Sequence, residues 1–430
     1  MKITILTQGS RGDVQPYVAL GVGLKNAGYQ VCMPASEIFH QLICAAGLDF
    51  IPIHGFDPQE FIRTPEIQAA VRQGGQLKIL SSLLRNAGPL LEGLFDEYWR
   101  TSADADLLIA SSLVFGIPDC AEKHGLPLIH APIHALLAPT RSFPSAFFAP
   151  WGAQENLLTN PITHRIVQFA FWSICRVTLN RWRLKMGLPR IDNYFQQMQA
   201  RNNPTLYGFS PSVLPIPDDW PSNHRVTGYW FLEPPSGWQP SHELIQFLES
   251  RPPPVYVGFG SMDTQNPARM TRLVVDALAA SGQRGVLASG WGGLQAGALP
   301  ETIFQIQEMP HSWLFSRMAA LVHHGGMGTT AAGLRAGIPA VIIPLGGDQP
   351  FWADRIQRLG VGIHSAGFFK ISTERLAADL MRAVSDPVLR TRAAVLGEKI
   401  RAEHGVDQAV GLIQNYQESL NSPAPFPKLC

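Results

Sequence analysis

Glycines and hydrogen-bond donors are concentrated after an apolar segment at 319–322 in the second half of the chain. The sequence His-His-Gly-Gly-Met-Gly-Thr-Thr occupies 323–330, and a helical pattern follows at 331–336. A glycine-rich turn that opens a helix presents free backbone N–H groups and the positive end of the helix dipole, which suits a diphosphate. His324 and the threonine hydroxyls add further donors. A purely structural turn after a strand is the alternative interpretation.

An acid and an amide follow the next apolar run, at 340–344. Asp348 accepts hydrogen bonds, whereas Gln349 both donates and accepts them, so the pair fits vicinal hydroxyls such as those of a sugar. The alternative is that the two residues start a helix as an N-cap pair.

A third candidate is the loop Gln-Gly-Ser-Arg-Gly-Asp at 8–13. It lacks the dinucleotide-binding fingerprint, because Gly9 and Gly12 are separated by two residues. Asp13 begins a helical pattern, where the helix dipole stabilises a carboxylate. It is either a helix N-cap or a general base that removes a proton from a hydroxyl nucleophile. His134, after another predicted strand, either assists this base or is an ordinary core or loop histidine.

These loops follow segments that have the pattern of buried strands. The predicted strands and helices alternate at 3–7, 14–26, 29–33, 38–46, 107–110 and 126–131, and again at 254–260, 267–281, 285–289, 319–323 and 340–344. Such alternation indicates a parallel sheet with right-handed crossovers, in which ligands bind beyond the carboxyl ends of the strands. The expected fold is α/β, with two Rossmann-like doubly wound domains that face each other across a cleft.

The domain boundaries follow from where this pattern stops and restarts. We expect a first domain at 1–230, a proline-rich extended linker at 231–253 and a second domain at 254–405. A final helix at 406–421 is expected to cross back to the first domain.

Composition indicates a globular enzyme that acts on small molecules. Of the 430 residues, 46% are hydrophobic and 16% are charged, and the net charge is +1. A nucleic-acid partner is not expected, since such proteins normally carry a basic excess. The five cysteines contain no C-x-x-C pair, and the apolar run at the N-terminus is too short for a signal peptide. A cytoplasmic location is therefore expected, with membrane contact limited to the periphery.

Aromatic and basic residues alternate in the region 140–189, which departs from the strand–helix pattern. Its members are Phe143, Phe147, Phe148, Trp151, Phe169, Phe171, Trp172 and Trp182, with Arg165, Arg176, Arg181, Arg183 and Lys185. An apolar insertion of this kind suits a flat lipophilic ligand. The helical part at 164–185 is either an amphipathic basic face for an anionic membrane or an ordinary buried helix with basic ends.

Three motifs in order, at 309–315, around His324 and at 348–352, carry a family resemblance. The chain resembles the nucleotide-sugar-dependent glycosyltransferases (UDP-glycosyltransferases), most closely the sterol 3-beta-glucosyltransferase branch, which is related to antibiotic glycosyltransferases. The resemblance implies the glycosyltransferase-B fold. It also implies inverting transfer of a hexose, such as glucose from UDP-glucose, to a hydroxyl of a sterol, other lipid, polyphenol or polyketide.

The resemblance also assigns site residues. Asp13 is implied as the catalytic base, and the implied donor-binding residues are Gly12, Ser261, Glu308, Met309, His324, Gly326, Gly328, Thr329, Asp348 and Gln349. The candidate acceptor-binding residues, taken from the region beside the cleft, are His134, Phe143, Phe148 and Trp151. No metal site and no tightly bound cofactor are expected, because the helix dipole and His324 would stabilise the leaving diphosphate.

Two positions depart from the plant members of the superfamily. Glu308 stands where those enzymes place a base-stacking tryptophan, and Ala332 where they place a ribose-binding glutamate. Neither position therefore supports the base and ribose contacts of those enzymes, and UDP is preferred over dTDP as the donor nucleotide on the family resemblance alone.

Three other functions remain as alternatives. A dinucleotide-dependent oxidoreductase would need the glycine fingerprint that is missing here. A nucleotide-sugar epimerase or a non-catalytic nucleotide-sugar binding protein could share the fold. The binding protein would not need a base in the cleft, and Asp13 therefore argues against it.

Overall fold

The chain folds as two compact units in the computed structural model. The first comprises Met1–Ser145, Ala153–Leu232 and His404–Cys430, and the second comprises Ala146–Gly152 and Glu233–Glu403. The structure describes residues 1–55, 64, 76–112, 114–135, 138–147, 158–235, 237–250, 252–260, 267–289, 299–307 and 309–421.

The first unit contains a seven-stranded parallel sheet in the order β3-β2-β1-β4-β5-β6-β7. Its strands are β1 (Lys2–Leu6), β2 (Gln30–Ala35), β3 (Asp49–Pro52), β4 (Leu107–Ala110), β5 (Leu128–His130), β6 (Thr205–Tyr207) and β7 (His224–Val226). Ile3 pairs with Val31 on one side and with Leu107 on the other. All four residues of β4 are buried, as expected for strands covered on both faces.

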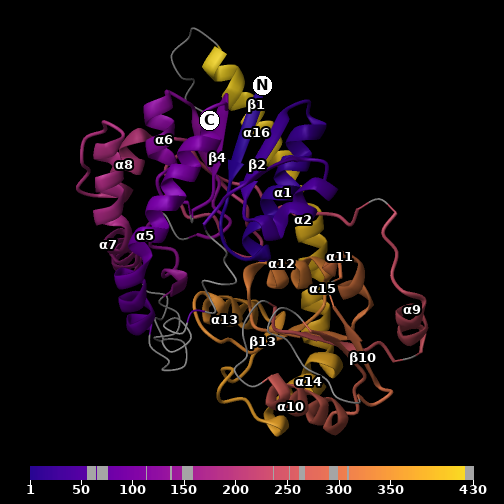
Figure 1. Cartoon of the computed structure of the whole chain (residues 1–430). Coiled ribbons are helices and arrows are strands. Elements are labelled where there is room, and N and C mark those ends of the chain that lie inside the picture. Colours follow the sequence, from indigo (N-terminus) through magenta and orange to yellow (C-terminus); the bar gives the residue numbers. More distant parts are fainter. Residues whose placement is uncertain are drawn as a thin grey trace. The chain divides into compact units, whose positions relative to one another are not determined.

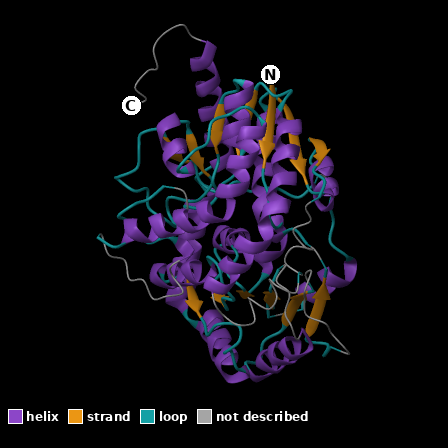
Figure 2. Ribbon diagram, turned by 60° about the vertical axis from the view of Figure 1, so that its left-hand side comes forward, coloured by secondary structure: helices purple, strands orange, loops and turns teal. Residues whose placement is uncertain are grey.

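Helices surround the strands of this sheet (Figures 1 and 2). They are α1 (Arg11–Asn26), η1 (Glu37–Phe39), α2 (His40–Ala45), α5 (Gln76–Ser102), α6 (Ile117–His124), α7 (Asn160–Lys185), α8 (Tyr194–Arg201) and α16 (Gly405–Asn421). Helix α16 packs closely against α1 at Gly23. A Cβ atom at this glycine would lie 2.4 Å from the Val406 side chain. The Tyr29 hydroxyl also donates a hydrogen bond to Gln417 of α16.

The second unit contains a six-stranded parallel sheet in the order β10-β9-β8-β11-β12-β13. Its strands are β8 (Val255–Gly258), β9 (Gly285–Ala288), β10 (Ile303–Ile306), β11 (Ala320–His323), β12 (Ala340–Ile342) and β13 (Gly362–His364). Its helices are α9 (His242–Glu249), α10 (Pro267–Ala280), α11 (His311–Leu314), η3 (Phe315–Arg317), α12 (Met327–Ala336), α13 (Gln349–Leu359), α14 (Thr373–Ser385) and α15 (Pro387–Arg401). Its core combines branched side chains of the central strands, such as Val257, Val322 and Val341, with apolar side chains of α10 and α14.

Several elements differ from the sequence-based expectations, and the strands β3, β6, β7, β10 and β13 were not predicted. Helix α1 begins at Arg11 rather than near 14, because Ser10 caps its N-terminus. The long helix α5 was not predicted. The proline-rich segment 231–253 is not extended throughout, since Ser241 caps α9 within it by accepting a hydrogen bond from the Leu244 N–H. None of the helices in the described ranges is long and apolar enough to span a bilayer.

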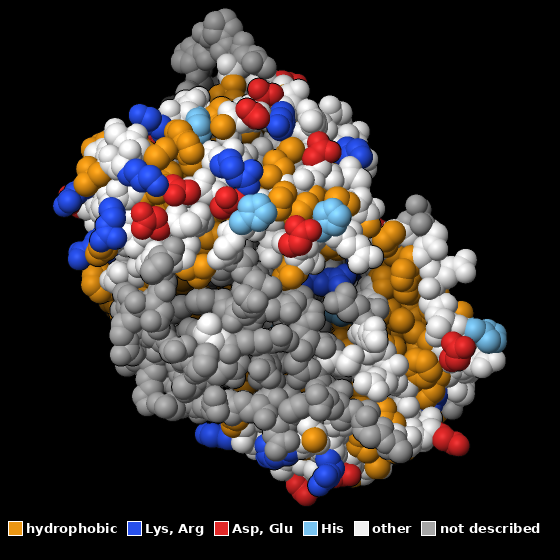
Figure 3. Space-filling model, viewed as in Figure 1, with side chains coloured by type: hydrophobic (Ala, Val, Ile, Leu, Met, Phe, Trp, Pro, Cys, Tyr) orange, Lys and Arg blue, Asp and Glu red, His pale blue; other side chains and the backbone are white. Residues whose placement is uncertain are grey.

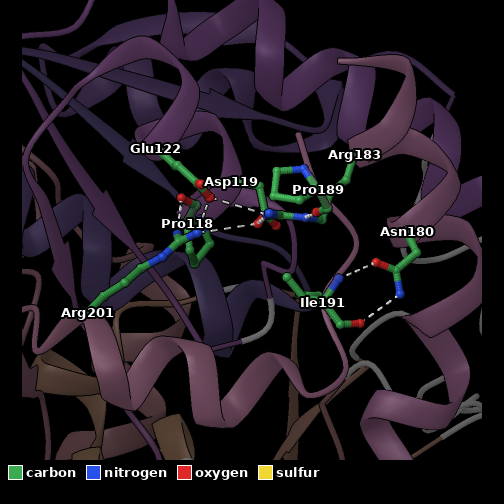
Figure 4. A network of polar contacts seen from close by, with 8 residues as sticks. All are labelled: Pro118, Asp119, Glu122, Asn180, Arg183, Pro189, Ile191 and Arg201. Atoms are coloured by element: carbon green, nitrogen blue, oxygen red, sulfur yellow. Dashed lines mark hydrogen bonds and ion pairs between the residues drawn. The ribbon is translucent and has the colours of Figure 1, made fainter. Parts of the chain in front are cut away.

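Helices α6, α7 and α8 are joined by a buried network of charges (Figure 4). Arg183 of α7 is fully buried, and its guanidinium forms an ion pair with Asp119 of α6. Its Nε donates to the backbone oxygen of Pro189 at 2.7 Å. Arg201 of α8 pairs with Glu122 and lies 3.7 Å from the Asp119 Oδ1. Of the two interpretations of the helix at 164–185, the buried helix with basic ends therefore describes Arg183, because this side chain points into the unit.

Candidate functional site

The turn after β11 depends on a glycine and a buried histidine. Gly325 has a φ of +93°, and a Cβ atom there would lie 2.7 Å from the Ile342 side chain and 3.2 Å from the Gln349 backbone oxygen. A side chain at this position would therefore strain the turn. The Gly325 N–H donates to Nδ1 of His323 at 3.1 Å. His323 thus holds the turn, a role that its sequence context does not reveal.

The first turn of α12 offers backbone N–H groups that have no acceptor within the helix. Gly326 is the N-cap, and Met327, Gly328 and Thr329 form the first turn. The N–H of Thr330 is the first to bond within the element, to the Gly326 oxygen at 3.0 Å. The amides of the first turn and the positive end of the helix dipole together favour an anionic ligand.

The imidazole of His324 lies beside this helix start and against two glycines. A Cβ atom at Gly326 would lie 2.4 Å from its Nε2, and one at Gly260, which follows β8, would lie 2.8 Å from its Cε1. The ring can occupy this place because both neighbours lack side chains. Strands β8 and β11 are adjacent where the strand order reverses. Ligands of doubly wound sheets bind at such a reversal.

His324 is uncharged at neutral pH in this environment. Burial lowers the pKa of His324 to about 4. Its Nδ1 is buried and has no hydrogen-bond partner among the described residues. A neutral imidazole with one unused nitrogen can donate to a ligand oxygen without adding a full charge to the site.

Asp348 and Gln349 both interact with the protein at the start of α13. The Gln349 Oε1 accepts hydrogen bonds from the N–H groups of Leu345 and Gly346, at 2.8 and 3.3 Å. Oδ2 of Asp348 accepts from the Trp352 indole at 2.8 Å. Asp348 occupies the N-cap position without a side-chain capping bond. The amide oxygen of Gln349 therefore holds the turn before α13.

Ser261, Glu308, Phe148 and Trp151 lie outside the described residues. Met309 is half-buried between β10 and α11.

In the first unit, Asp13 belongs to the capping box of α1. Its Oδ2 accepts hydrogen bonds from the Ser10 N–H at 2.8 Å and from the Ser10 hydroxyl at 2.9 Å. Ser10, and not Asp13, is therefore the N-cap. A Cβ atom at Gly9 would lie 2.4 Å from the same oxygen, so this glycine makes room for the carboxylate. Gly12 is the second residue of the helix.

The second carboxylate oxygen of Asp13 faces His134. The Asp13 Oδ1 lies 3.5 Å from the His134 Nε2, and the two side chains are 22% and 13% exposed. Burial and the Asp13 charge together raise the pKa of the nearby Tyr17 well above its usual value, which keeps this phenol neutral. The structure thus brings together two residues separated by more than a hundred positions in the chain.

Phe143, a candidate acceptor contact, is only 2% exposed. Its ring packs against His164 and Trp220, with ring centroids 6.1 and 6.3 Å apart. Trp220 in turn stacks on Tyr207 at 4.3 Å. Phe143 is therefore part of an aromatic core in this structure.

Buried histidines should make the fold sensitive to acid. Burial lowers the pKa of His130 and His224 in the first unit to about 4, and the pKa of His323 falls well below its usual value. An unfolded histidine titrates near 6.5, so between pH 6.5 and 4 protons bind the unfolded chain more strongly than the folded one. We expect the free energy of unfolding, measured by urea denaturation, to fall over this range. The loss for His130 alone should reach about 3 kcal/mol.

A pair of variants separates this effect from general acid denaturation. The His130→Leu protein should lose less stability on acidification than the wild type, because the group that protonates on unfolding is gone. His242→Gln changes an exposed histidine and should behave like the wild type. An unchanged pH dependence in His130→Leu would contradict the assignment.

Sequence models of two protein families match the chain. The model described as Glycosyltransferase family 28 N-terminal domain matches residues 3–135. The model described as Erythromycin biosynthesis protein CIII-like, C-terminal domain, matches residues 286–411.

Curated proteins of known name are similar over most of the chain. The chain is 36% identical over 427 residues to O-mycaminosyltylonolide 6-deoxyallosyltransferase of Streptomyces fradiae, covering 97% of this chain and 98% of that protein. It is 38% identical over 435 residues to Sterol 3-beta-glucosyltransferase of Neurospora crassa, covering 96% of this chain. The chain spans only 27% of that fungal protein's length.

Solved structures share the fold. The Calicheamicin Glycosyltransferase CalG4 superposes with a TM-score of 0.70 at 18% identity, covering 99% of both chains. The Streptomyces sp. SF2575 glycosyltransferase SsfS6, complexed with thymidine diphosphate, superposes with a TM-score of 0.65 at 20% identity, covering 96% of this chain and 99% of that chain.

Proposed function

Since the chain belongs to the glycosyltransferase family that includes the sterol 3-beta-glucosyltransferases and antibiotic glycosyltransferases, we propose that it transfers glucose from UDP-glucose to a hydroxyl of a lipophilic acceptor with inversion. The family resemblance and the expected fold of two parallel-sheet α/β domains are confirmed. The alternatives of an epimerase and a non-catalytic binding protein are not favoured, because the relatives are named as transferases.

The observation that supports this proposal most directly is the start of α12. Its free N–H groups, including those of Gly328 and Thr329, would bind the donor diphosphate together with the neutral His324 imidazole. The same groups would stabilise the negative charge that develops on the leaving diphosphate. Asp348 and Gln349 would bind hydroxyls of the transferred sugar.

Asp13 is the proposed general base. An acceptor hydroxyl is a weak nucleophile at neutral pH, so a positioned base must take its proton as the glycosidic bond forms. The capping bonds to Ser10 hold one oxygen of Asp13, whereas the other faces His134. His134 would orient the carboxylate and share the proton.

The donor assignment predicts a specific loss in one variant. His324→Ala should weaken the binding of UDP by about 10- to 100-fold, because a hydrogen bond to a charged group usually contributes this much to affinity. Isothermal titration calorimetry measures this directly, with His242→Gln as the matched control on the surface of the same unit. A folded His324→Ala protein with the wild-type Kd would argue against diphosphate contact by this ring.

One incubation tests the proposed function as a whole. The protein is mixed with UDP-glucose or dTDP-glucose and with sterols or phenols, and products are detected by mass. The incubation includes dTDP-glucose because the structurally similar SsfS6 was solved in complex with thymidine diphosphate. A β-glucoside formed from UDP-glucose supports the proposal. Products from dTDP-glucose alone, products with the α configuration, or no transfer to any of these acceptors would each contradict it.

A further inference from the structure

One face of α7 carries large hydrophobic side chains that the first unit does not cover. They are Ile162, Ile166, Phe169, Val177 and Leu184, between 48% and 72% exposed. Their spacing of three, four, seven and eight residues puts them on one stripe of the helix. Other exposed large hydrophobic side chains of the described residues are distributed over several elements.

The opposite face of α7 explains why this stripe points outward. Trp182 packs on Phe95 of α5, and its indole donates to Asp96 at 2.9 Å. Trp172 stacks on Tyr194 of α8. The orientation of the helix is therefore set by its buried aromatic residues, and the described residues of this unit leave the stripe exposed.

The exposed stripe is also cationic. Helix α7 contains no Asp or Glu. Two of its five cations are neutralised, because Arg183 pairs with Asp119 and Lys185 pairs with Asp96. The other three are Arg165, Arg176 and Arg181, which are exposed and form no ion pair among the described residues. In Figure 3, basic and hydrophobic side chains lie next to each other at the left-hand edge, the side on which Figure 1 labels α7.

We propose that α7 is a membrane-contact helix that lies flat on an anionic lipid surface. The hydrophobic side chains would enter the acyl boundary while the three arginines pair with lipid phosphates. From Ile162 to Leu184 the stripe is about 33 Å long, so contact would extend along the whole helix. A second copy of the chain fits less well, because self-association of this face would bring arginines together without acidic partners.

This inference rests on α7 alone and does not require the proposed sugar transfer. It explains how a lipophilic acceptor dissolved in a bilayer could be reached. Its test therefore measures lipid binding rather than product, and turnover with a water-soluble phenol reports separately on the enzyme.

The experiment is flotation of the full chain with two kinds of vesicle. One contains phosphatidylcholine, and the other contains equal parts of phosphatidylcholine and phosphatidylglycerol. We expect binding to the anionic vesicles that weakens with added salt. Replacing Arg165, Arg176 and Arg181 together by Gln should reduce the partition coefficient on the order of a hundredfold, at roughly fivefold for each arginine.

Two further variants test the apolar half of the stripe. Phe169→Glu with Val177→Glu should abolish vesicle binding, whereas Val388→Glu with Val395→Glu, at exposed hydrophobic positions of α15, should not. Both pairs alter exposed side chains, and circular dichroism checks that they fold. Absence of wild-type binding to anionic vesicles, equal binding by the triple arginine variant, or a wild-type dimer that Phe169→Glu dissociates would overturn the proposal.

Discussion

Replacing Asp13 by Asn should reduce kcat by about 10²- to 10⁴-fold, the usual contribution of a general base. The amide cannot accept the acceptor's proton at neutral pH, although it has almost the same shape as the carboxylate. Its oxygen can still accept the hydrogen bonds from Ser10 that cap α1. The chemistry is therefore removed while the helix start is retained. Initial rates at saturating donor and acceptor measure the change.

The control for this variant separates catalysis from capping. Ser10→Ala removes the hydroxyl bond to the Asp13 Oδ2 and should cost about 1 kcal/mol of stability, while the carboxylate remains. We expect its kcat to fall far less than that of Asp13→Asn. The Kd for UDP should be unchanged in both, because the proposed diphosphate contacts come from the second unit. Near-normal turnover by Asp13→Asn would show that another group is the base.

Replacing Arg183 by Met should reduce the free energy of unfolding by about 3–5 kcal/mol. Burial raises the pKa of Asp119 to about 6, and the guanidiniums of Arg183 and Arg201 oppose this rise. Without Arg183, the buried carboxylate must either stay charged with only Arg201 nearby, 3.7 Å away, or take up a proton. Either outcome destabilises the packing of α6 and α7. Urea unfolding monitored by circular dichroism measures the loss.

Two comparisons show whether the loss comes from an unpaired buried charge. Combining Arg183→Met with Asp119→Leu removes both charges and should recover much of the stability, because an apolar pair replaces the ion pair. Lys185→Met breaks an ion pair with Asp96 whose side chains are about half exposed, so it should cost less than about 1 kcal/mol. A double variant no more stable than Arg183→Met would mean that the arginine acts through packing alone.

Local sequence signals were sufficient for eight of the thirteen described strands and for the loops that follow these eight, whereas β3, β6, β7, β10 and β13 were not predicted. The strand predicted at 107–110 coincides with β4, and the helix predicted at 267–281 differs from α10 by one residue. Runs of β-branched and apolar residues bounded by glycine carry this information within a few positions. The glycine turn at 323–330 was recognisable for the same reason, because glycine marks where a backbone must turn tightly.

Contacts between distant parts of the chain could not be obtained in this way. The pairing of Arg183 with Asp119, the approach of His134 to Asp13 and the contact of His324 with Gly260 each join residues from separate elements. Helical periodicity could not decide whether Arg183 faces solvent, since it lies at the border of the buried face of α7. The local pattern of a chain specifies its elements, whereas the partner of a charged or ring side chain depends on which elements pack together. That packing is a property of the folded units.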